Sequence, residues 1–419
     1  MSSQQVIVIG AGIVGICTAL SLRQRDQDVL LLDRLPPARE TSHGNAGVIC
    51  NSGIHPLADP ELLSQAPKLL ANLDPRFLLN YSELPWLATW LMRFARNCNR
   101  RTFELCTSQI ASLTADALPR HLDLMKQAGA LDLLNDSGWL KLFRSTSRLS
   151  SSRKLLSDYQ HFGVPCDVLN GPEVRELEPD LGIDYAGGWW LKNTPSVRDP
   201  GLLCQNYFKL FMSQGGRFQQ CETEAIEPCR DNWRITAKDS VLTTTKIVLA
   251  MGAWSNHLLQ PLGVRLPFAL ERGYHMMFAY PEGKQLNRSV VDIELGYVIT
   301  PMRDGLRTTT GSNLVAREIP PQDRQLQTLL PHIRETFPLG RPLLDKPWMG
   351  RRASTPDSQP LIGPIKRHPG LYVATGHCHL GLTLGPITGE LIADEICGQP
   401  NPLCEPFYPD RNSSTMYIP

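Results

Sequence analysis

Three glycines near the N-terminus carry the first chemical signature of the chain. Gly10, Gly12 and Gly15 have the spacing Gly-x-Gly-x-x-Gly and directly follow the apolar run Val6–Ile9. In a dinucleotide-binding turn the first glycine permits the tight turn, the second lets the backbone approach a pyrophosphate, and the third lets the next helix pack on the strand. The amides that open this helix favour an anionic ligand. We therefore expect this turn to contact a nucleotide cofactor through Gly10, Gly12, Ile13, Val14 and Gly15.

An acidic residue ends the second expected strand. Asp33 follows the apolar run Val29–Leu32, where a carboxylate accepts hydrogen bonds from the ribose hydroxyls of adenosine. We assign the neighbouring Arg34 to the same cofactor site. The fingerprint alone fits both NAD and FAD.

The segment after Asp33 favours FAD. Residues 40–48 gather small and hydrogen-bonding side chains, which can run along a flat ring system with little steric hindrance. The cofactor candidates in this segment are Ser42, His43, Asn45, Ala46 and Gly47.

Together with the glycine turn, residues 40–48 resemble the D-amino-acid oxidase/dehydrogenase superfamily of flavoproteins, and within it the bacterial D-amino-acid dehydrogenases. Residues 247–255, which end in Gly-Ala-Trp-Ser, and residues 348–363, which lead into 375–383, carry the same resemblance in the family's order. The resemblance implies FAD as cofactor and hydride transfer to flavin N5 from the Cα of a D-amino acid. A cyclic substrate such as D-proline or hydroxyproline fits this chemistry. Electrons would then pass to a quinone or another carrier.

The resemblance also implies further cofactor and catalytic residues. Gly252 and the C-terminal signature would contact the flavin, with hydrogen-bond donors supplied by residues 381–383 and by a helix N-terminus near Ile387. Arg352 occupies the family's substrate-arginine position and would bind the carboxylate in two-pronged geometry, with Arg351 as the competing candidate. Tyr274 and His275 would line the substrate pocket, and His379 would face the substrate. The cofactor residues expected from the C-terminal signature are Gly376, His377, Gly381, Leu382 and Thr383.

The elements that position these residues predict an α/β fold. The parallel unit at the N-terminus and its expected partner strands, far away in sequence, imply a discontinuous Rossmann-like FAD-binding domain. An interleaved substrate domain of antiparallel β-sheet plus helices would include a strand at Tyr274–Tyr280. The last helix is expected at Ile387–Ile396. The predicted division assigns 1–55, 198–265 and 346–419 to the FAD-binding domain, and 56–197 and 266–345 to the substrate domain.

The composition of the chain excludes several other classes of protein. Hydrophobic residues make up 42% and charged residues 20% of the 419 residues, which is ordinary globular usage. The formal net charge of +1 gives no field for nucleic acid, so no nucleic-acid partner is expected. The 11 cysteines contain no Cys-x-x-Cys pair, so we expect neither a disulfide framework nor a metal site.

Localisation follows from the absence of long apolar runs. The chain shows no signal peptide and no run long enough to cross a membrane, so we expect a cytoplasmic protein. Residues 84–96 are apolar and aromatic and then basic. They fit a core helix or a helix in peripheral contact with the inner face of a membrane.

Two other functions stay open from the sequence. The chain fits a flavoprotein subunit of a hetero-oligomeric dehydrogenase complex, whose partner subunits take the electrons. It also fits an amino-acid oxidase that uses O2, because oxygen reactivity depends on access and charge beside the flavin.

Overall fold

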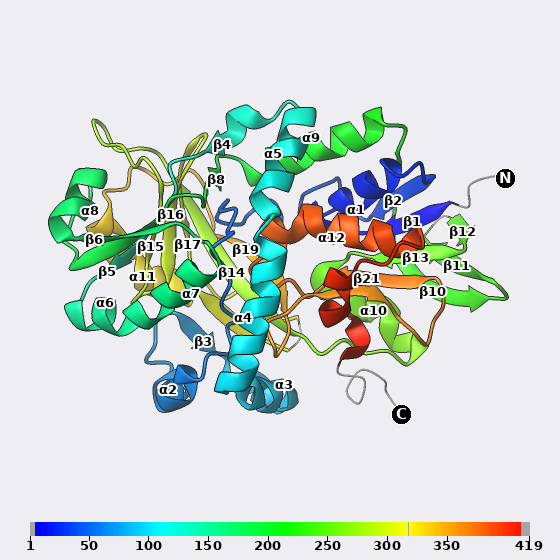
Figure 1. Cartoon of the computed structure of the whole chain (residues 1–419), viewed down its shortest axis with the longest axis horizontal. Helices are drawn as coiled ribbons and strands as arrows, with labels where there is room; N and C mark the ends of the chain where they lie inside the picture. The colour runs from blue at the N-terminus through cyan, green and yellow to red at the C-terminus, as the bar shows by residue number, and fades with distance from the viewer. Residues whose placement is uncertain (1–4, 239, 317, 412–419) are drawn as a thin grey trace.

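A six-stranded sheet forms one half of the molecule, on the right of Figure 1. A computed structural model describes residues 5–238, 240–316 and 318–411, so the outermost residues of the predicted FAD-binding domain lie outside the described residues. β1 pairs in parallel with β2 and β13, and β13 pairs in parallel with β21. Their side chains are almost all buried, as expected of a parallel sheet covered on both faces. The strands, in sheet order, are β20 (Leu361–Pro364), β21 (Leu371–Thr375), β13 (Lys246–Leu249), β1 (Val6–Ile9), β2 (Val29–Asp33) and β9 (Arg217–Gln220).

Helices cover one face of this sheet, and a small sheet covers the other. α1 (Ile13–Arg23) lies beside α12 (Gly381–Ile396), as Figure 1 shows, and α9 (Pro200–Ser213) packs on α1. The opposite face packs against α10 (Ser255–Leu259) and a three-stranded sheet. That sheet comprises β10 (Thr223–Cys229), β11 (Asn232–Ala237) and β12 (Ser240–Thr244).

The last helix begins earlier than the predicted Ile387. α12 starts at Gly381 and continues through Pro386, which cannot donate to the carbonyl of Leu382 four residues earlier. His121 Nε2 lies 2.8 Å from that carbonyl oxygen and replaces the missing donor. The helix therefore passes a proline that local sequence reasoning treats as a helix start.

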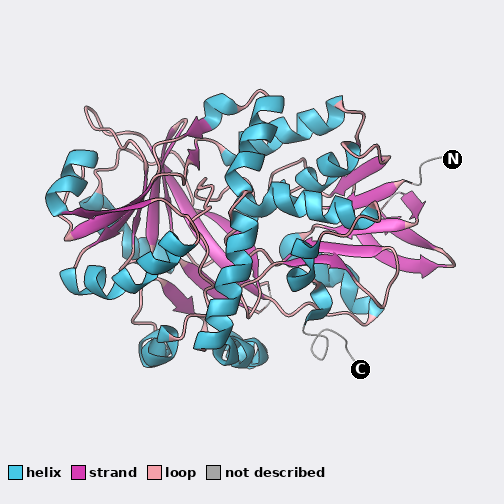
Figure 2. Cartoon of the chain, viewed as in Figure 1, coloured by secondary structure: helices cyan, strands magenta, loops and turns pink. Residues whose placement is uncertain are grey.

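A ten-stranded sheet forms the other half of the molecule, on the left of Figure 2. It is mostly antiparallel, with parallel pairs between β15 and β5 and between β18 and β3. The strands are β3 (Phe77–Leu79), β18 (Ser312–Val315), β14 (Ala269–Phe278), β17 (Gly305–Thr309), β16 (Tyr297–Met302), β15 (Ser289–Asp292), β5 (Trp139–Phe143), β7 (Gly187–Leu191), β6 (Cys166–Asn170) and β19 (Trp348–Ser354). The predicted α/β fold with a second, largely antiparallel sheet is confirmed.

One boundary of the predicted domain division differs in the structure. The predicted FAD-binding segment 346–419 includes β19, but β19 pairs with Ala269–His275 of β14 and so belongs to the ten-stranded sheet. The chain enters the six-stranded sheet only at β20. The rest of the division stays a prediction.

Four α-helices lie between residues 61 and 127. α4 runs between the two halves of the molecule in Figure 1, and α5 packs on α12. These helices are α2 (Glu61–Leu70), α3 (Leu84–Asn97), α4 (Arg100–Thr114) and α5 (Ala117–Gln127). The ten-stranded sheet also carries α6 (Thr146–Ser152), α7 (Leu156–His161), α8 (Gly171–Leu177) and α11 (Arg324–Thr336).

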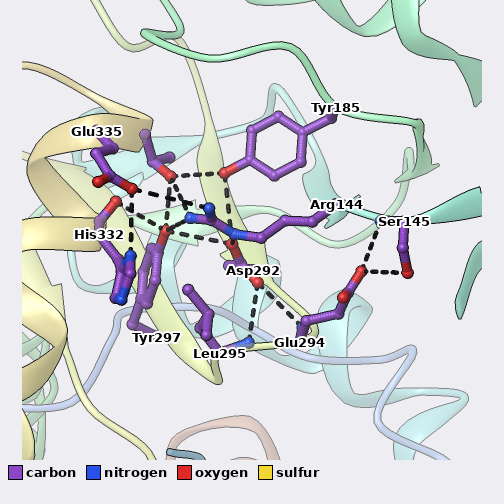
Figure 3. Close-up of polar contacts among 10 residues, drawn as sticks. Arg144, Ser145, Tyr185, Asp292, Glu294, Leu295, Tyr297, His332 and Glu335 are labelled. Carbon is purple, nitrogen blue, oxygen red and sulfur yellow. Dashed lines mark hydrogen bonds and ion pairs between the residues drawn. The ribbon is translucent and has the colours of Figure 1, made fainter.

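A buried polar network ties α11 to the ten-stranded sheet (Figure 3). Arg144 Nε lies 2.5 Å from Asp292 Oδ2, and the Asp292 side chain is fully buried. The Tyr297 hydroxyl lies 2.6 Å from Thr336 Oγ1, and the Tyr185 hydroxyl lies 2.6 Å from the same oxygen. Because Asp292 is buried, Arg144 is the charge that makes its burial tolerable.

Candidate active site

One large cavity lies between the two sheets and takes wall residues from both. We call it the main cavity. The six-stranded half contributes the glycine turn, Asp33 and the loop before α12. The ten-stranded half contributes Trp139 of β5, Val298 of β16 and Arg352 of β19. A ligand here therefore touches both a nucleotide-type turn and the second sheet.

The glycine turn has the geometry that its spacing predicts. Gly10 has φ +112°, and a Cβ placed on it would lie 2.5 Å from the carbonyl oxygen of Ala250. A Cβ on Gly15 would lie 1.7 Å from the carbonyl oxygen of Gly10, so Gly15 sets the close packing of α1 on β1 and is not on the cavity wall. Gly12, Ile13 and Val14 lie on the wall with Gly10.

The start of α1 offers donors for an anion. Among the described residues, the backbone amides of Gly12 and Val14 have no hydrogen-bond acceptor. The Ile13 amide donates to Ser42 Oγ at 3.0 Å, which leaves the Ser42 hydroxyl hydrogen free to turn toward the cavity. These groups fit a pyrophosphate.

Asp33 and Arg34 both lie on the wall. Asp33 Oδ2 accepts from the Ala11 amide at 2.6 Å, and Oδ1 accepts from the Leu35 amide at 2.9 Å. The carboxylate therefore also braces its own loop. Arg34 pairs with Glu40 and stacks over the ring of Trp254.

The loop of residues 42–47 is fixed by internal hydrogen bonds and by one arginine. Asn45 Oδ1 accepts from the Gly47 amide at 2.8 Å, and Arg307 of β17 donates to the Asn45 carbonyl at 2.7 Å. Ser42, Asn45, Ala46 and Gly47 lie on the wall. The ring of His43, a predicted cofactor residue, instead packs against Gly201 at the start of α9 and does not line the main cavity.

The C-terminal signature forms the wall at the start of α12. Gly376, His377, Gly381 and Leu382 lie on the wall, and so does Gly252, φ +53°, of the Gly-Ala-Trp-Ser turn. Burial lowers the pKa of His377 to about 4, and its Nε2 lies 2.9 Å from Thr388 Oγ1. Since α12 begins at Gly381, the N-terminus of the helix, which is the positive end of its dipole, faces the main cavity.

Thr383 lies behind this wall. Its hydroxyl accepts a hydrogen bond from the Cys50 amide at 2.8 Å, so it supports the wall from behind.

Arg352 is the guanidinium of the second sheet that reaches the main cavity beside a buried carboxylate. Its Nη1 lies 2.6 Å from Glu271 Oε1, while its side chain stays 25% exposed. Burial raises the pKa of Glu271, but Arg352 and the hydroxyls of Ser312 and Ser354 outweigh it and hold that pKa below its ordinary value. Glu271 is therefore a carboxylate that fixes the arginine through one nitrogen and leaves the others for a ligand.

Arg351 points the other way along β19. Its Nε lies 2.8 Å from a carboxylate oxygen of Glu318, and its guanidinium stacks over the ring of Trp254. Consecutive residues of a strand point to opposite faces, so Arg351 and Arg352 lie on opposite faces of β19. Arg351 also borders the main cavity. The alternation of the strand therefore separates the two candidates, with Arg352 beside Glu271 and Arg351 beside the Gly-Ala-Trp-Ser turn.

His379 lies on the main cavity wall. Its side chain is exposed, and the protein around it and Arg352 lower its pKa from the ordinary value while Glu271 opposes the lowering. Its imidazole is neutral near pH 7, so it can donate or accept a hydrogen bond without adding charge beside a substrate.

Tyr274 and His275, the other predicted catalytic residues, are not on this wall. The Tyr274 hydroxyl accepts from the Gln322 amide at 2.8 Å, and the residue borders a smaller pocket beside Arg352. His275 stacks on Trp348, its Nδ1 lies 2.8 Å from the Gly44 carbonyl oxygen, and burial lowers its pKa to about 3. The structure gives both residues core contacts, because Tyr274 packs in a cluster with Leu329 and Ile333 of α11 and His275 packs on Trp348 of β19.

Residues 5–395 match the family described as FAD dependent oxidoreductase (DAO). The chain belongs to the DAO family of FAD-dependent oxidoreductases. This confirms the predicted superfamily and the predicted cofactor, FAD. The DAO-family relatives include a D-amino-acid oxidase of Bradyrhizobium diazoefficiens, 28% identical, which covers 97% of this chain and 99% of that protein. A D-amino acid dehydrogenase of the same organism is 29% identical and covers 94% of this chain and 95% of that protein.

Solved structures agree on the fold. Glycine oxidase from Geobacillus kaustophilus superimposes with a TM-score of 0.77 at 19% identity, covering 97% of this chain and 99% of that one. L-proline dehydrogenase from P. horikoshii gives a TM-score of 0.74 at 17% identity, covering 100% of this chain and 99% of that one. These likenesses show the fold, while the family match and the curated relatives show that the chain is an FAD-dependent amino-acid oxidoreductase.

Sequence reasoning missed several residues of this DAO-family site. Glu271 alternates with Gly273 on β14 and faces β19, and a Cβ on Gly273 would lie 2.6 Å from Arg352 Nη2. In the sequence, an acidic residue and a glycine at alternate positions of one strand were the signal that could have pointed to a partner for the arginine. No sequence pattern marked Trp139 or Thr310 as a site residue, because only the pairing of distant strands brings them to the main cavity.

No helix among the described residues is long and apolar enough to cross a membrane.

Proposed function

We propose that this DAO-family enzyme oxidises a D-amino acid whose carboxylate binds Arg352. The observation that carries the proposal is the position of Arg352, which borders the main cavity while Glu271 holds only its Nη1. A guanidinium so placed can donate to a carboxylate through its remaining N–H groups, which are the preferred donors for planar, two-pronged recognition.

The chain's own residues would hold FAD and orient the substrate. Gly12, Val14 and Ser42 would bind the pyrophosphate, Asp33 the ribose, and the start of α12 the flavin. When bound, FAD supplies the acceptor for the hydride that leaves the substrate Cα and the route by which its two electrons reach a second acceptor. The substrate ammonium loses one proton to solvent before oxidation. The imine of a primary amine takes up water and breaks down to a keto acid and ammonia, whereas a cyclic imine takes up water and opens to an amino keto acid that keeps the nitrogen.

The main cavity also suits a cyclic substrate. Trp139 and Val298 offer apolar contact near the arginine, while Thr310 and the neutral His379 offer hydrogen bonds to a ring hydroxyl. We therefore propose D-proline or a hydroxy-D-proline as the substrate to test first. The name of the structural relative L-proline dehydrogenase points to the same ring, although that likeness concerns the fold.

For the electron acceptor we propose a quinone or a carrier at the inner face of a membrane, with the enzyme in the cytoplasm. The dehydrogenase name of one relative supports this acceptor, and the oxidase name of another supports O2 as the alternative. A hetero-oligomeric complex is the second alternative.

The test is an anaerobic screen of the FAD-loaded enzyme against paired D- and L-amino acids, followed by flavin absorbance. We expect bleaching by D-amino acids, strongest with the cyclic ones, and little by the L-forms. Re-oxidation by a quinone analogue should exceed that by air. Bleaching by L-amino acids alone would refute the stereochemistry, and fast re-oxidation by air would replace the dehydrogenase with an oxidase.

A further inference from the structure

The outward side of α3 carries a stripe of apolar side chains. Pro85, Ala88, Met92 and Ala95 are exposed and follow one another at helical spacing along the solvent side. The inward side is apolar as well, and its Leu87 is fully buried. The outward side also carries the exposed Thr89 and Arg96, so the apolar side chains form a stripe beside polar positions, and an exposed apolar stripe of this kind marks an interaction surface.

α2 repeats this pattern beside α3. None of its residues is buried, and Leu63, Pro67 and Leu70 form an exposed apolar stripe at helical spacing. Leu73, just after the helix, is 73% exposed. The Tyr81 hydroxyl donates to the Leu70 carbonyl at 2.8 Å and ties the end of α2 to the turn before α3. Figure 1 places both helices at the same edge of the molecule.

We call this region the α2–α3 surface. Its large exposed apolar side chains are Leu63, Leu70, Leu73, Tyr81, Trp86 and Met92.

The charges around the α2–α3 surface are positive. Lys68, Arg93, Arg96 and Arg101 have no carboxylate partner among the described residues. Of the nearby carboxylates, Glu83 before α3 is buried and accepts from the Ala316 amide, Asp59 before α2 is half-buried and accepts from the Glu61 amide, and the others lie in ion pairs. Those in ion pairs are Glu61, Asp74 and Glu104.

We propose that the α2–α3 surface docks on a lipid bilayer with anionic headgroups. Two helices with outward apolar stripes and flanking cations match the chemistry of an interfacial membrane contact: apolar side chains enter the acyl boundary, and the cations meet lipid phosphates. Cations without carboxylate partners favour an anionic lipid over a neutral one.

This docking would place the substrate strand near the lipid. Trp90 of α3 donates through Nε1 to the Ser354 carbonyl at 2.9 Å, and Ser354 ends β19, the strand that carries Arg352. A lipid-soluble quinone would then reach the enzyme without leaving the membrane. That consequence rests on the proposed function, whereas the docking itself does not.

The experiment is flotation of the FAD-loaded full-length protein with vesicles of phosphatidylcholine alone or with phosphatidylglycerol added. We expect binding to the phosphatidylglycerol vesicles that weakens as salt rises, and little binding to phosphatidylcholine. The double variant Leu63→Glu/Met92→Glu should bind at least tenfold less while keeping wild-type activity with a soluble dye acceptor, because both side chains are exposed. Val241→Glu is the matched control, since Val241 is 63% exposed on β12 in the other half.

Two results would overturn the proposal. The first is that the wild-type protein binds neither kind of vesicle. This result would also be seen if a protein partner or a second copy of the chain covered these helices instead of lipid. The other is equal loss of binding in the double variant and in Val241→Glu. Neither result depends on whether the enzyme oxidises D-amino acids, so failure of the docking and failure of the proposed reaction are separable.

Discussion

Replacing Arg352 by alanine tests substrate binding and separates it from stability. The change removes the proposed carboxylate ligand and leaves Glu271 buried with only the Ser312 and Ser354 hydroxyls as partners. Truncating one partner of a buried charge pair costs about 2–5 kcal/mol in binding. At about 1.4 kcal/mol per tenfold, kcat/KM should fall by about 30-fold to several thousand-fold.

The same change should also destabilise the fold. An uncompensated buried carboxylate costs about 3–5 kcal/mol, so the melting temperature of Arg352→Ala should drop. The double variant Arg352→Ala/Glu271→Gln removes the stranded charge. It should regain most of the stability and none of the lost kcat/KM.

The assay combines steady-state kinetics with a dye acceptor, FAD content and thermal unfolding. Arg352→Lys should recover part of the activity, because an ammonium keeps the charge and loses the two-pronged contact. Arg351→Ala is the control and should change kcat/KM little, since Arg351 is held by Glu318 and Trp254. A kcat/KM for Arg352→Ala within threefold of wild type would refute the assignment. So would a larger loss in Arg351→Ala.

Three further predictions follow from the cofactor turn, a buried histidine and the buried ion pair. Gly12→Val should abolish FAD binding, and Asp33→Ala should weaken it by about 1.5–3 kcal/mol per lost hydrogen bond, measured as FAD bound per chain; full occupancy in Gly12→Val would rule out this phosphate site. Because the pKa of His275 is lowered to about 3, the unfolded chain binds the extra proton first as pH falls below about 6.5. The free energy of unfolding should therefore fall by up to about 3 kcal/mol between pH 6.5 and 4.5 through this residue. Denaturant titrations of His275→Gln at several pH values should show a free energy of unfolding that depends less steeply on pH. Arg144→Leu should cost about 3–5 kcal/mol of stability by stranding Asp292, yet leave kcat near wild type; an unchanged melting temperature would contradict the role of the pair.

Local sequence patterns anticipated much of the fold because buried parallel strands are continuous apolar runs. The apolar runs Val6–Ile9 and Val29–Leu32 form β1 and β2, and β2 continues to Asp33. β14 was expected to start at Tyr274 but starts at Ala269. The charged residues Glu271 and Arg272 made the first part of this strand look exposed in the sequence. Arg272 is nevertheless buried, and its guanidinium donates to two backbone carbonyls of the segment after β18.

The site shows the same division between local and tertiary information. The glycine turn and Asp33 could be predicted because their chemistry depends on short spacings. The partner of Arg352 could not, since Glu271 lies 81 residues away and meets it only through the pairing of β14 with β19. His43 and His275 were misplaced for a related reason, because the face that each ring occupies is decided by α9 and by Trp348.

The most direct test of the central claim is a crystal structure of the FAD-loaded enzyme with pyrrole-2-carboxylate, a planar carboxylate that has no Cα hydrogen to lose. The account predicts FAD along the glycine turn and the start of α12, with the ligand carboxylate within hydrogen-bond distance of the Arg352 guanidinium and beside His379. A carboxylate bound instead to Arg351, or a flavin ring remote from β19, would contradict it.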